Sequence, residues 1–248
     1  MESHWQMAKP RKSQHNSGEP LVRTCHWLKW ADSDYLAARH LLLGSMVVQG
    51  AILANTAIEK YLKALYAHLG LSIPRSHNVQ ALYCELTTSG KSTTVLNDSF
   101  LSILPKAYDL RYPDELPDGF NIAINQIKLL AELDRTVFAI TNSFVFTEGT
   151  VDLVLARAAK HGDERFLTKN VVLRAQQTKD CFATDSRSFE FRIQKPLIIN
   201  FEYLSPNVAD DGLFDQIGAV LTPDKGVQLA FPRGPGELKF NNMFDWPK

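Results

Sequence analysis

The sequence lacks the features that would place it in several common classes of protein. It has three cysteines in 248 residues, and none has a cysteine or histidine partner at the spacing of a structural zinc site. Its 27 basic and 27 acidic residues leave no formal net charge, which argues against broad, non-specific binding of duplex nucleic acid. We therefore expect reduced cysteines, no metal, and at most a local pocket for a nucleotide or an RNA loop.

Long apolar runs are also missing. No run approaches the ~20 residues that a helix needs to span a membrane. Residues 1–20 are polar with no apolar stretch behind them, so we predict no secretory signal and interpret residues 1–23 as a disordered arm. Phosphate-binding loops, dinucleotide fingerprints and hydrolase or zinc-protease motifs do not occur either. These absences predict a cytoplasmic protein without a cofactor.

Apolar residues recur at spacings of three and four from about residue 24 to residue 148, which is the period of amphipathic helices. Short connections between such helices predict antiparallel neighbours in a bundle. The predicted helices cover about 24–43, 49–68, a short segment after "IPRSHN", 96–107 and 121–144. We expect Ser76 or Asn78 to cap the third helix and Gly70 to end the second.

The remaining residues, 149–248, have a different pattern. "VDLVLARAAKHG" predicts one more helix that ends at Gly162, whereas "SFEFRIQ" and "LIINFEY" alternate apolar and polar residues as half-buried strands do. "AVLTPDKGVQLAF" predicts two strands joined by a turn. The chain as a whole is therefore predicted to be α+β, an all-α bundle at 24–148 followed by a smaller region with an antiparallel sheet.

Two groups of polar residues could carry a function. Asn55, Glu59 and Lys63 are four residues apart and lie on one line of the second helix. They form either a solvated face with one ion pair or the polar wall of a cleft. Arg75 and His77 precede the third helix, whose N-terminus would favour a phosphate, although a histidine there often only caps or packs.

The order of four segments is more specific than any of them alone. "LKWADSDYLAARHLL", "AIEKYLKALYAHLG", "IPRSHNVQAL" and "AYDLRYP" follow one another over about residues 24–145, and together they resemble the HEPN domain (higher eukaryotes and prokaryotes nucleotide-binding). The resemblance implies an up-and-down helical bundle that is usually a homodimer. Its members include metal-independent ribonucleases, among them toxins paired with small nucleotidyltransferases, and non-catalytic forms that bind nucleotides or other macromolecules.

Members that cleave RNA use an arginine followed four to six residues later by a histidine. Arg111 lies between the fourth and fifth predicted helices, but "YPDELPDGF" follows it and contains no histidine. Arginine stays protonated, so it can stabilise a phosphate but cannot accept the proton of the 2′-hydroxyl. A purely structural arginine is the alternative, paired with Asp109 or Asp114 while Tyr112 packs.

The leading hypothesis is therefore a nucleotide- or RNA-binding protein without catalytic activity. Its candidate site residues are Arg111, Tyr112, Arg75, His77, Asn55, Glu59 and Lys63. A second hypothesis is a metal-independent ribonuclease that uses Arg111 with another base, for which His77 is the first candidate. A third is an interaction module that only dimerises or docks a nucleotidyltransferase-type partner.

Overall fold

A computed structural model describes residues 20–146, 153–174, 186–194 and 197–205 of the chain. Most of the predicted disordered arm and the whole of "AVLTPDKGVQLAF" lie outside the described residues. The first helix begins at Pro20, a few residues earlier than its periodicity predicts.

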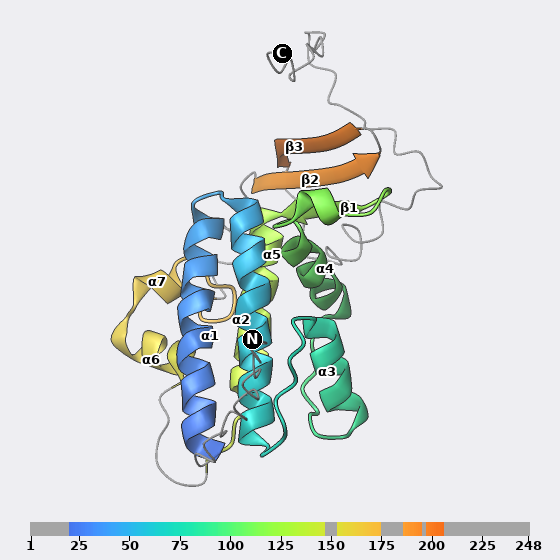
Figure 1. The fold of residues 1–248 in the computed structure, drawn as a ribbon. Helices are drawn as coiled ribbons and strands as arrows, with labels where there is room; N and C mark the ends of the chain where they lie inside the picture. The colour runs from blue at the N-terminus through green and yellow to red at the C-terminus, as the bar shows by residue number, and fades with distance from the viewer. Residues whose placement is uncertain (1–19, 147–152, 175–185, 195–196, 206–248) are drawn as a thin grey trace, which may run out of the picture.

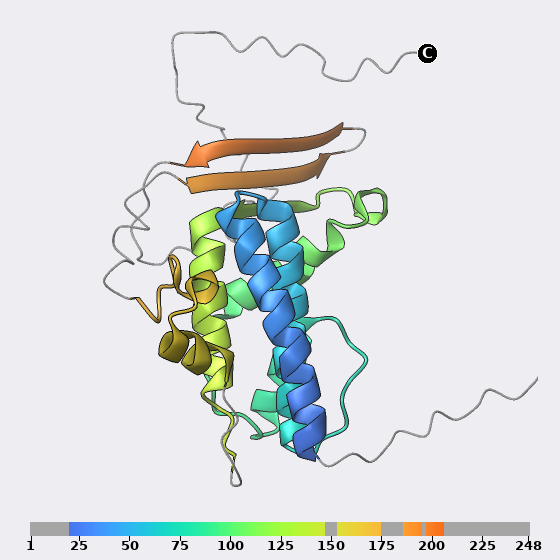
Figure 2. The same ribbon diagram turned by 90° about the vertical axis from the view of Figure 1, so that its left-hand side faces the viewer.

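Five helices form a bundle, as predicted. They are α1 (Pro20–Leu43), α2 (Val47–His68), α3 (Val79–Thr88), α4 (Asp98–Asp109) and α5 (Gln126–Thr141), with a short 3-10 turn η1 (Pro113–Glu115) after α4. The long helices α1 and α2 lie side by side, α5 packs against both, and α3 and α4 lie on the other side of α2 from α1 (Figures 1 and 2). None of the described helices combines the length and the apolarity needed to cross a membrane.

Local signals explain where these helices begin and end. Asn78, Asn97 and Asn125 precede α3, α4 and α5, and each side chain accepts a hydrogen bond from the backbone N–H three residues later. Asn78 is thus the cap of α3, whereas Ser76 accepts a hydrogen bond from the Asn78 N–H. Gly70 follows α2 with φ of +67°, the left-handed conformation that glycine adopts without strain.

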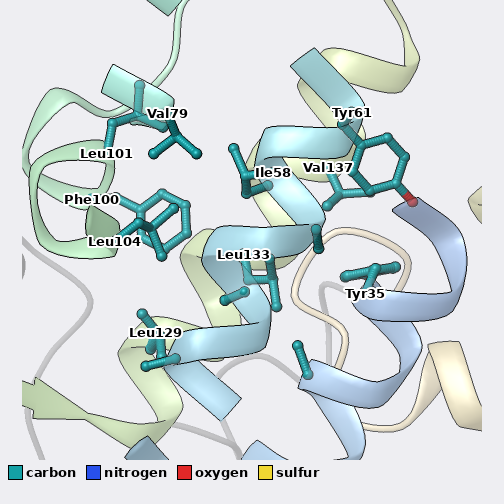
Figure 3. Packing of buried hydrophobic residues seen from close by; sticks show 14 of the residues in the cluster. Tyr35, Ile58, Tyr61, Val79, Phe100, Leu101, Leu104, Leu129, Leu133 and Val137 are labelled. Atoms are coloured by element: carbon teal, nitrogen blue, oxygen red, sulfur yellow. The ribbon is translucent and has the colours of Figure 1, made fainter. Parts of the chain in front are cut away.

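The hydrophobic core lies where α2 meets the other helices. Ile58 from α2 and Leu133 from α5 belong to this core, with Phe100 from α4 on one side of α2 and Tyr35 from α1 on the other (Figure 3). The predicted apolar stripes of α1, α2 and α5 are buried, apart from Leu69, which is 37% exposed at the end of α2.

A three-stranded antiparallel sheet covers one end of the bundle (Figure 1). Its strands are β1 (Asn121–Asn125), β2 (Ser186–Gln194) and β3 (Leu197–Ser205), in that order. The prediction that the fifth helix starts at residue 121 is therefore wrong for its first five residues. Ile122 and Ile124 are buried opposite Phe191 and Phe189 of β2, so tertiary pairing outweighs the helical pattern at this point.

The segment after the bundle returns along the outer side of α1 as α6 (Val154–His161) and the short α7 (Glu164–Leu167) (Figure 1). Gly162 ends α6 with φ of +67°, as predicted.

Arg39 of α1 is fully buried and is paired with Asp134 of α5. Its guanidinium also donates to the carbonyls of Arg165 and Thr168. This buried ion pair therefore ties α1 to α5 and to the α6–α7 segment.

Candidate functional site

Arg111 lies in the turn between α4 and η1, and its guanidinium lies on an aromatic ring. The central carbon of the guanidinium is 3.4 Å from the centroid of the Tyr108 ring and 5.0 Å from that of Tyr112. Its Nε donates to the Tyr108 carbonyl at 3.0 Å. The turn after α4 thus fixes the cation through cation–π contact and one hydrogen bond, while Tyr112 itself remains 54% exposed.

Among the described residues, no carboxylate forms an ion pair with Arg111. Within residues 20–146, neither Asp109 nor Asp114 forms an ion pair with it, so the pairing with an acid of its own loop is not formed, and the structural contacts of Arg111 are those with Tyr108 and Tyr112. Burial raises the pKa of Asp109, and the positive charge of Arg111 opposes that rise. The guanidinium therefore keeps most of its hydrogen-bond donors available for a ligand.

His77 lies on the same tyrosine. Its ring stacks on that of Tyr108 at 5.9 Å between centroids and 21° between planes. Its Nδ1 is 3.1 Å from Oε2 of Glu59 on α2. The side chain of His77 is 62% exposed, whereas that of Glu59 is 7% exposed. A buried carboxylate thus holds an exposed imidazole against the ring that Arg111 also contacts, and when Nδ1 carries the proton, Nε2 remains an acceptor.

The polar line on α2 is buried. The other oxygen of Glu59 accepts a hydrogen bond from Nζ of Lys63 at 2.7 Å, and that nitrogen lies 5.6 Å from the ring of Trp27 on α1. The predicted Glu59–Lys63 pair is confirmed, but the alternative of a solvated face is wrong, since Asn55, Glu59 and Lys63 are all buried. Burying both charges requires that they be paired with each other.

Asn55 differs from the other two residues of the line. It is fully buried one turn before Glu59, and neither its amide nitrogen nor its amide oxygen has a hydrogen-bond partner. An unpaired buried amide costs about 1–3 kcal/mol. The core packing of α2 does not call for a polar side chain at this position.

Arg75 is not joined to these residues by any contact that the structure shows. It is exposed and makes no hydrogen bond or ion pair with another residue of the described ranges. The N-terminus of α3 beside it is already capped, because Asn78 accepts from the Ala81 N–H at 3.0 Å. Of the candidates, the structure thus joins Glu59, Lys63, His77, Arg111 and Tyr112 through direct contacts or through Tyr108, and leaves Arg75 and Asn55 without a hydrogen bond or ion pair to them.

Tyr108 is the residue that sequence reasoning missed. Its ring joins His77 to Arg111, which are 34 positions apart in the numbering. A signal was present, because Tyr108 and Arg111 are three residues apart at the end of a helix, the spacing at which neighbouring side chains meet. We call the surface formed by His77, Tyr108, Arg111 and Tyr112 the Tyr108 surface.

This arrangement can bind an anion and stack on a base. Arginine offers a planar fork of donors that fits phosphate, and the exposed rings of Tyr112 and His77 offer stacking faces, because that of Tyr108 is covered by Arg111. Within the described residues, no group of three or more histidine, cysteine or acidic side chains is placed to hold a metal ion.

Comparison with known proteins bears on the same region. Residues 25–134 match the family model of the HEPN domain, which confirms the resemblance drawn from the sequence and the helical character of this part. The match spans α1 to the middle of α5 and contains every residue of the Tyr108 surface. No curated protein and no solved structure matches the chain significantly. At the level of the family, the match supports a function related to nucleotides or RNA.

Proposed function

We propose, from the HEPN domain match over residues 25–134, that the protein binds a nucleotide or a segment of RNA at the Tyr108 surface without cleaving it. One observation carries the proposal: Arg111 is held on the ring of Tyr108 and has no carboxylate partner in the part of the chain that the structure describes. An arginine fixed on an aromatic ring with most of its donors free is arranged for a phosphate.

The buried contacts beneath the surface support this proposal. Lys63 and Glu59 are paired within α2, and Glu59 positions His77 beside Tyr108. A ring fixed in this way can stack on a base with little loss of conformational freedom on binding. The unpaired amide of Asn55, one turn away, costs stability and is explained if a ligand or an altered state of the site uses it.

The absence of a histidine after Arg111 supports binding over cleavage. Residues 112–120, "YPDELPDGF", contain no group that is well suited to accept the 2′-hydroxyl proton near neutral pH.

A second candidate, a metal-independent endoribonuclease, is favoured by the Glu59–His77 contact of 3.1 Å. In that reaction, Nε2 of His77 takes the proton of the 2′-hydroxyl, and the 2′-oxygen attacks the phosphorus. The 5′-oxygen leaves with a proton from water, and Arg111 stabilises the charge on the phosphate.

Fluorescence anisotropy with a labelled single-stranded RNA and with a labelled mononucleotide tests the binding proposal. We expect Arg111→Ala and Tyr108→Leu each to weaken RNA binding by about tenfold, because each removes a charge-assisted or stacking contact. Lys106→Ala is the matched control, since Lys106 is an exposed cation on α4, the helix of Tyr108, and does not belong to the Tyr108 surface. Equal weakening by Lys106→Ala, or unchanged binding in Arg111→Ala, would refute the proposal.

Gel analysis of the same RNA without added metal separates the two functions. If the protein only binds, the RNA remains intact with wild type and with His77→Ala. If wild type cleaves and both His77→Ala and Arg111→Ala abolish cleavage, the second candidate replaces the first. Cleavage that survives in both variants would come from a contaminant or from another part of the chain.

The third hypothesis concerns partners. The family resemblance leads us to propose a homodimer, with a nucleotidyltransferase-type protein as a further possible partner. One chain has a mass of 27.9 kDa. Light scattering of the purified protein at micromolar concentration should give twice that mass. A monomer under these conditions, with RNA binding intact, would show that the Tyr108 surface functions without a second copy.

A further inference from the structure

A cavity of about 700 Å³ lies between α1 and the α6–α7 segment, and no residue of the Tyr108 surface lines it. Its size falls within the range of small-molecule sites. One side is α1, from Cys25 to Leu36, and the other is formed by residues between Leu153 and Phe166. The second side lies beyond residue 134, where the HEPN match ends. We call this cavity the α1–α6 pocket.

Buried contacts hold the two sides of the pocket in place. The guanidinium of Arg39 on α1 donates to the carbonyl of Thr168 and, at 3.4 Å, to that of Arg165. The ring of Phe166 packs 5.9 Å from that of Tyr35. The shape of the pocket is therefore built into the fold.

Part of the lining is apolar. It includes Leu28, Leu36, Leu153, Val154 and Phe166. These side chains come from α1 and from the α6–α7 segment, so an apolar body between them would lose water on both faces.

The acidic groups of the pocket are already engaged. Asp32 accepts a hydrogen bond from the buried hydroxyl of Tyr61 at 2.7 Å. Asp163 is bound by the guanidinium of Arg165 at 2.7 and 2.9 Å and by its backbone N–H at 3.1 Å. Asp163 is thus paired with a cation, and Asp32 is bound by a neutral donor.

The remaining basic groups are not engaged. The side chains of Lys29, Arg157 and His161 line the pocket and make no hydrogen bond or ion pair with any residue of the described ranges. Arg157 acts on Asp32 and Asp163 only through its charge, at longer range. The free hydrogen-bonding capacity of the pocket therefore consists mainly of donors, which selects against a cation and favours an anion.

We propose that the α1–α6 pocket binds a small amphipathic anion. Its acidic head, a carboxylate, sulfonate or phosphate, is held by Lys29, Arg157 and His161. Its apolar body lies against the leucine and phenylalanine side chains of the lining. The proposal is independent of RNA binding at the Tyr108 surface.

Fluorescence titration with 8-anilinonaphthalene-1-sulfonate, an aromatic body with one sulfonate, tests the proposal. N-phenyl-1-naphthylamine has the same body without the charge and serves as the neutral probe. We expect one dye site per chain, and the double variant Lys29→Gln, Arg157→Gln should bind the sulfonate about tenfold more weakly while binding the neutral probe as wild type does. Lys160→Gln, an exposed basic position on α6 outside the lining, should leave both affinities unchanged.

Three results would overturn the proposal. The first is equal affinity for the sulfonate in wild type and in the double variant. The second is an equal loss for the neutral probe, which would show that the pocket does not select charge. The third concerns Ser33→Trp, which places an indole in the pocket from an exposed position on α1. This variant should block both probes, and unchanged binding would place the dye elsewhere. Matching circular dichroism spectra and unfolding temperatures confirm that each variant is folded.

Discussion

Asp32 should destabilise the folded protein at neutral pH, and Asp32→Asn should remove that effect. Burial raises the pKa of the Asp32 carboxyl from 3.8 to about 6, against the opposing influence of the Tyr61 hydroxyl and the charge of Arg157. A raised carboxyl pKa means that between about pH 4 and pH 6 the folded state binds more protons than the unfolded state. The contribution of Asp32 to stability is therefore most favourable below pH 4 and is lost as the pH rises through 6.

The size of the effect follows from the shift. A rise of the Asp32 pKa from 3.8 to about 6 corresponds to a loss of about 3 kcal/mol in the free energy of unfolding once the carboxyl is ionised in both the folded and the unfolded state. Because the side chain keeps some contact with water, we expect about 2 kcal/mol, or an increase of about 4–8 °C in unfolding temperature for Asp32→Asn above pH 7. The amide oxygen of asparagine can still accept the hydrogen bond from Tyr61, so the packing is retained.

Differential scanning calorimetry of wild type and Asp32→Asn between pH 4 and pH 8 measures this difference. We expect the two unfolding temperatures to coincide near pH 4 and to separate as the pH rises through 6. Asp114→Asn, at an exposed position without an ion pair among the described residues, should follow wild type throughout. An Asp32→Asn variant that is less stable than wild type at pH 8, or an offset that stays constant across the range, would refute the reasoning.

Three further changes test the interior by urea denaturation. Arg39→Met should lower the free energy of unfolding by about 3–5 kcal/mol, because it leaves Asp134 buried without its counter-charge; a loss below about 1 kcal/mol would contradict this role. Asn55→Leu should raise it by about 1–2 kcal/mol, since no group pairs with the buried amide, while RNA binding weakens. Stabilisation with unchanged RNA binding would place Asn55 outside the site. Gly50→Ala should lower it by about 1–3 kcal/mol, because the new Cβ would lie 2.6 Å from Cγ of Leu42. An unchanged midpoint for this variant would show that Leu42 moves aside.

The local sequence pattern predicted most of the helices correctly. It failed where a strand pairs with residues that are far away in the sequence. The periodicity of α1, α2 and α5 and the asparagine caps are properties of neighbouring residues. "NIAIN", Asn121 to Asn125, continues the apolar pattern of the helix after it, and only the pairing of Ile124 with Phe189, 65 positions later, makes it a strand. A pattern within a short window contains no information about such a partner.

The candidate site was predicted in part for the same reason. Arg111 and His77 could be selected by residue type, but their meeting on Tyr108 depends on how the loop before α3 and the end of α4 pack together. Charged residues on a helix are usually exposed, so the burial of Glu59 and Lys63 could not be read from their spacing. Their partners, His77 and Trp27, lie outside α2 and are brought to it only by the fold.

Buried polar groups are fully paired around Arg39 and Asp134 but not at the candidate site. Around Arg39 and Asp134, the guanidinium and the carboxylate are each engaged by several partners, as stability of the buried pair requires. Among the described residues, the buried side-chain nitrogen and oxygen atoms without a partner both belong to Asn55, next to the Glu59–His77 contact. An apolar residue should be more stable at that position, so folding alone does not account for the asparagine, and a role in binding is the prediction that remains to be measured. The opposite effects of Asn55→Leu on stability and on RNA binding would distinguish these two explanations within one variant.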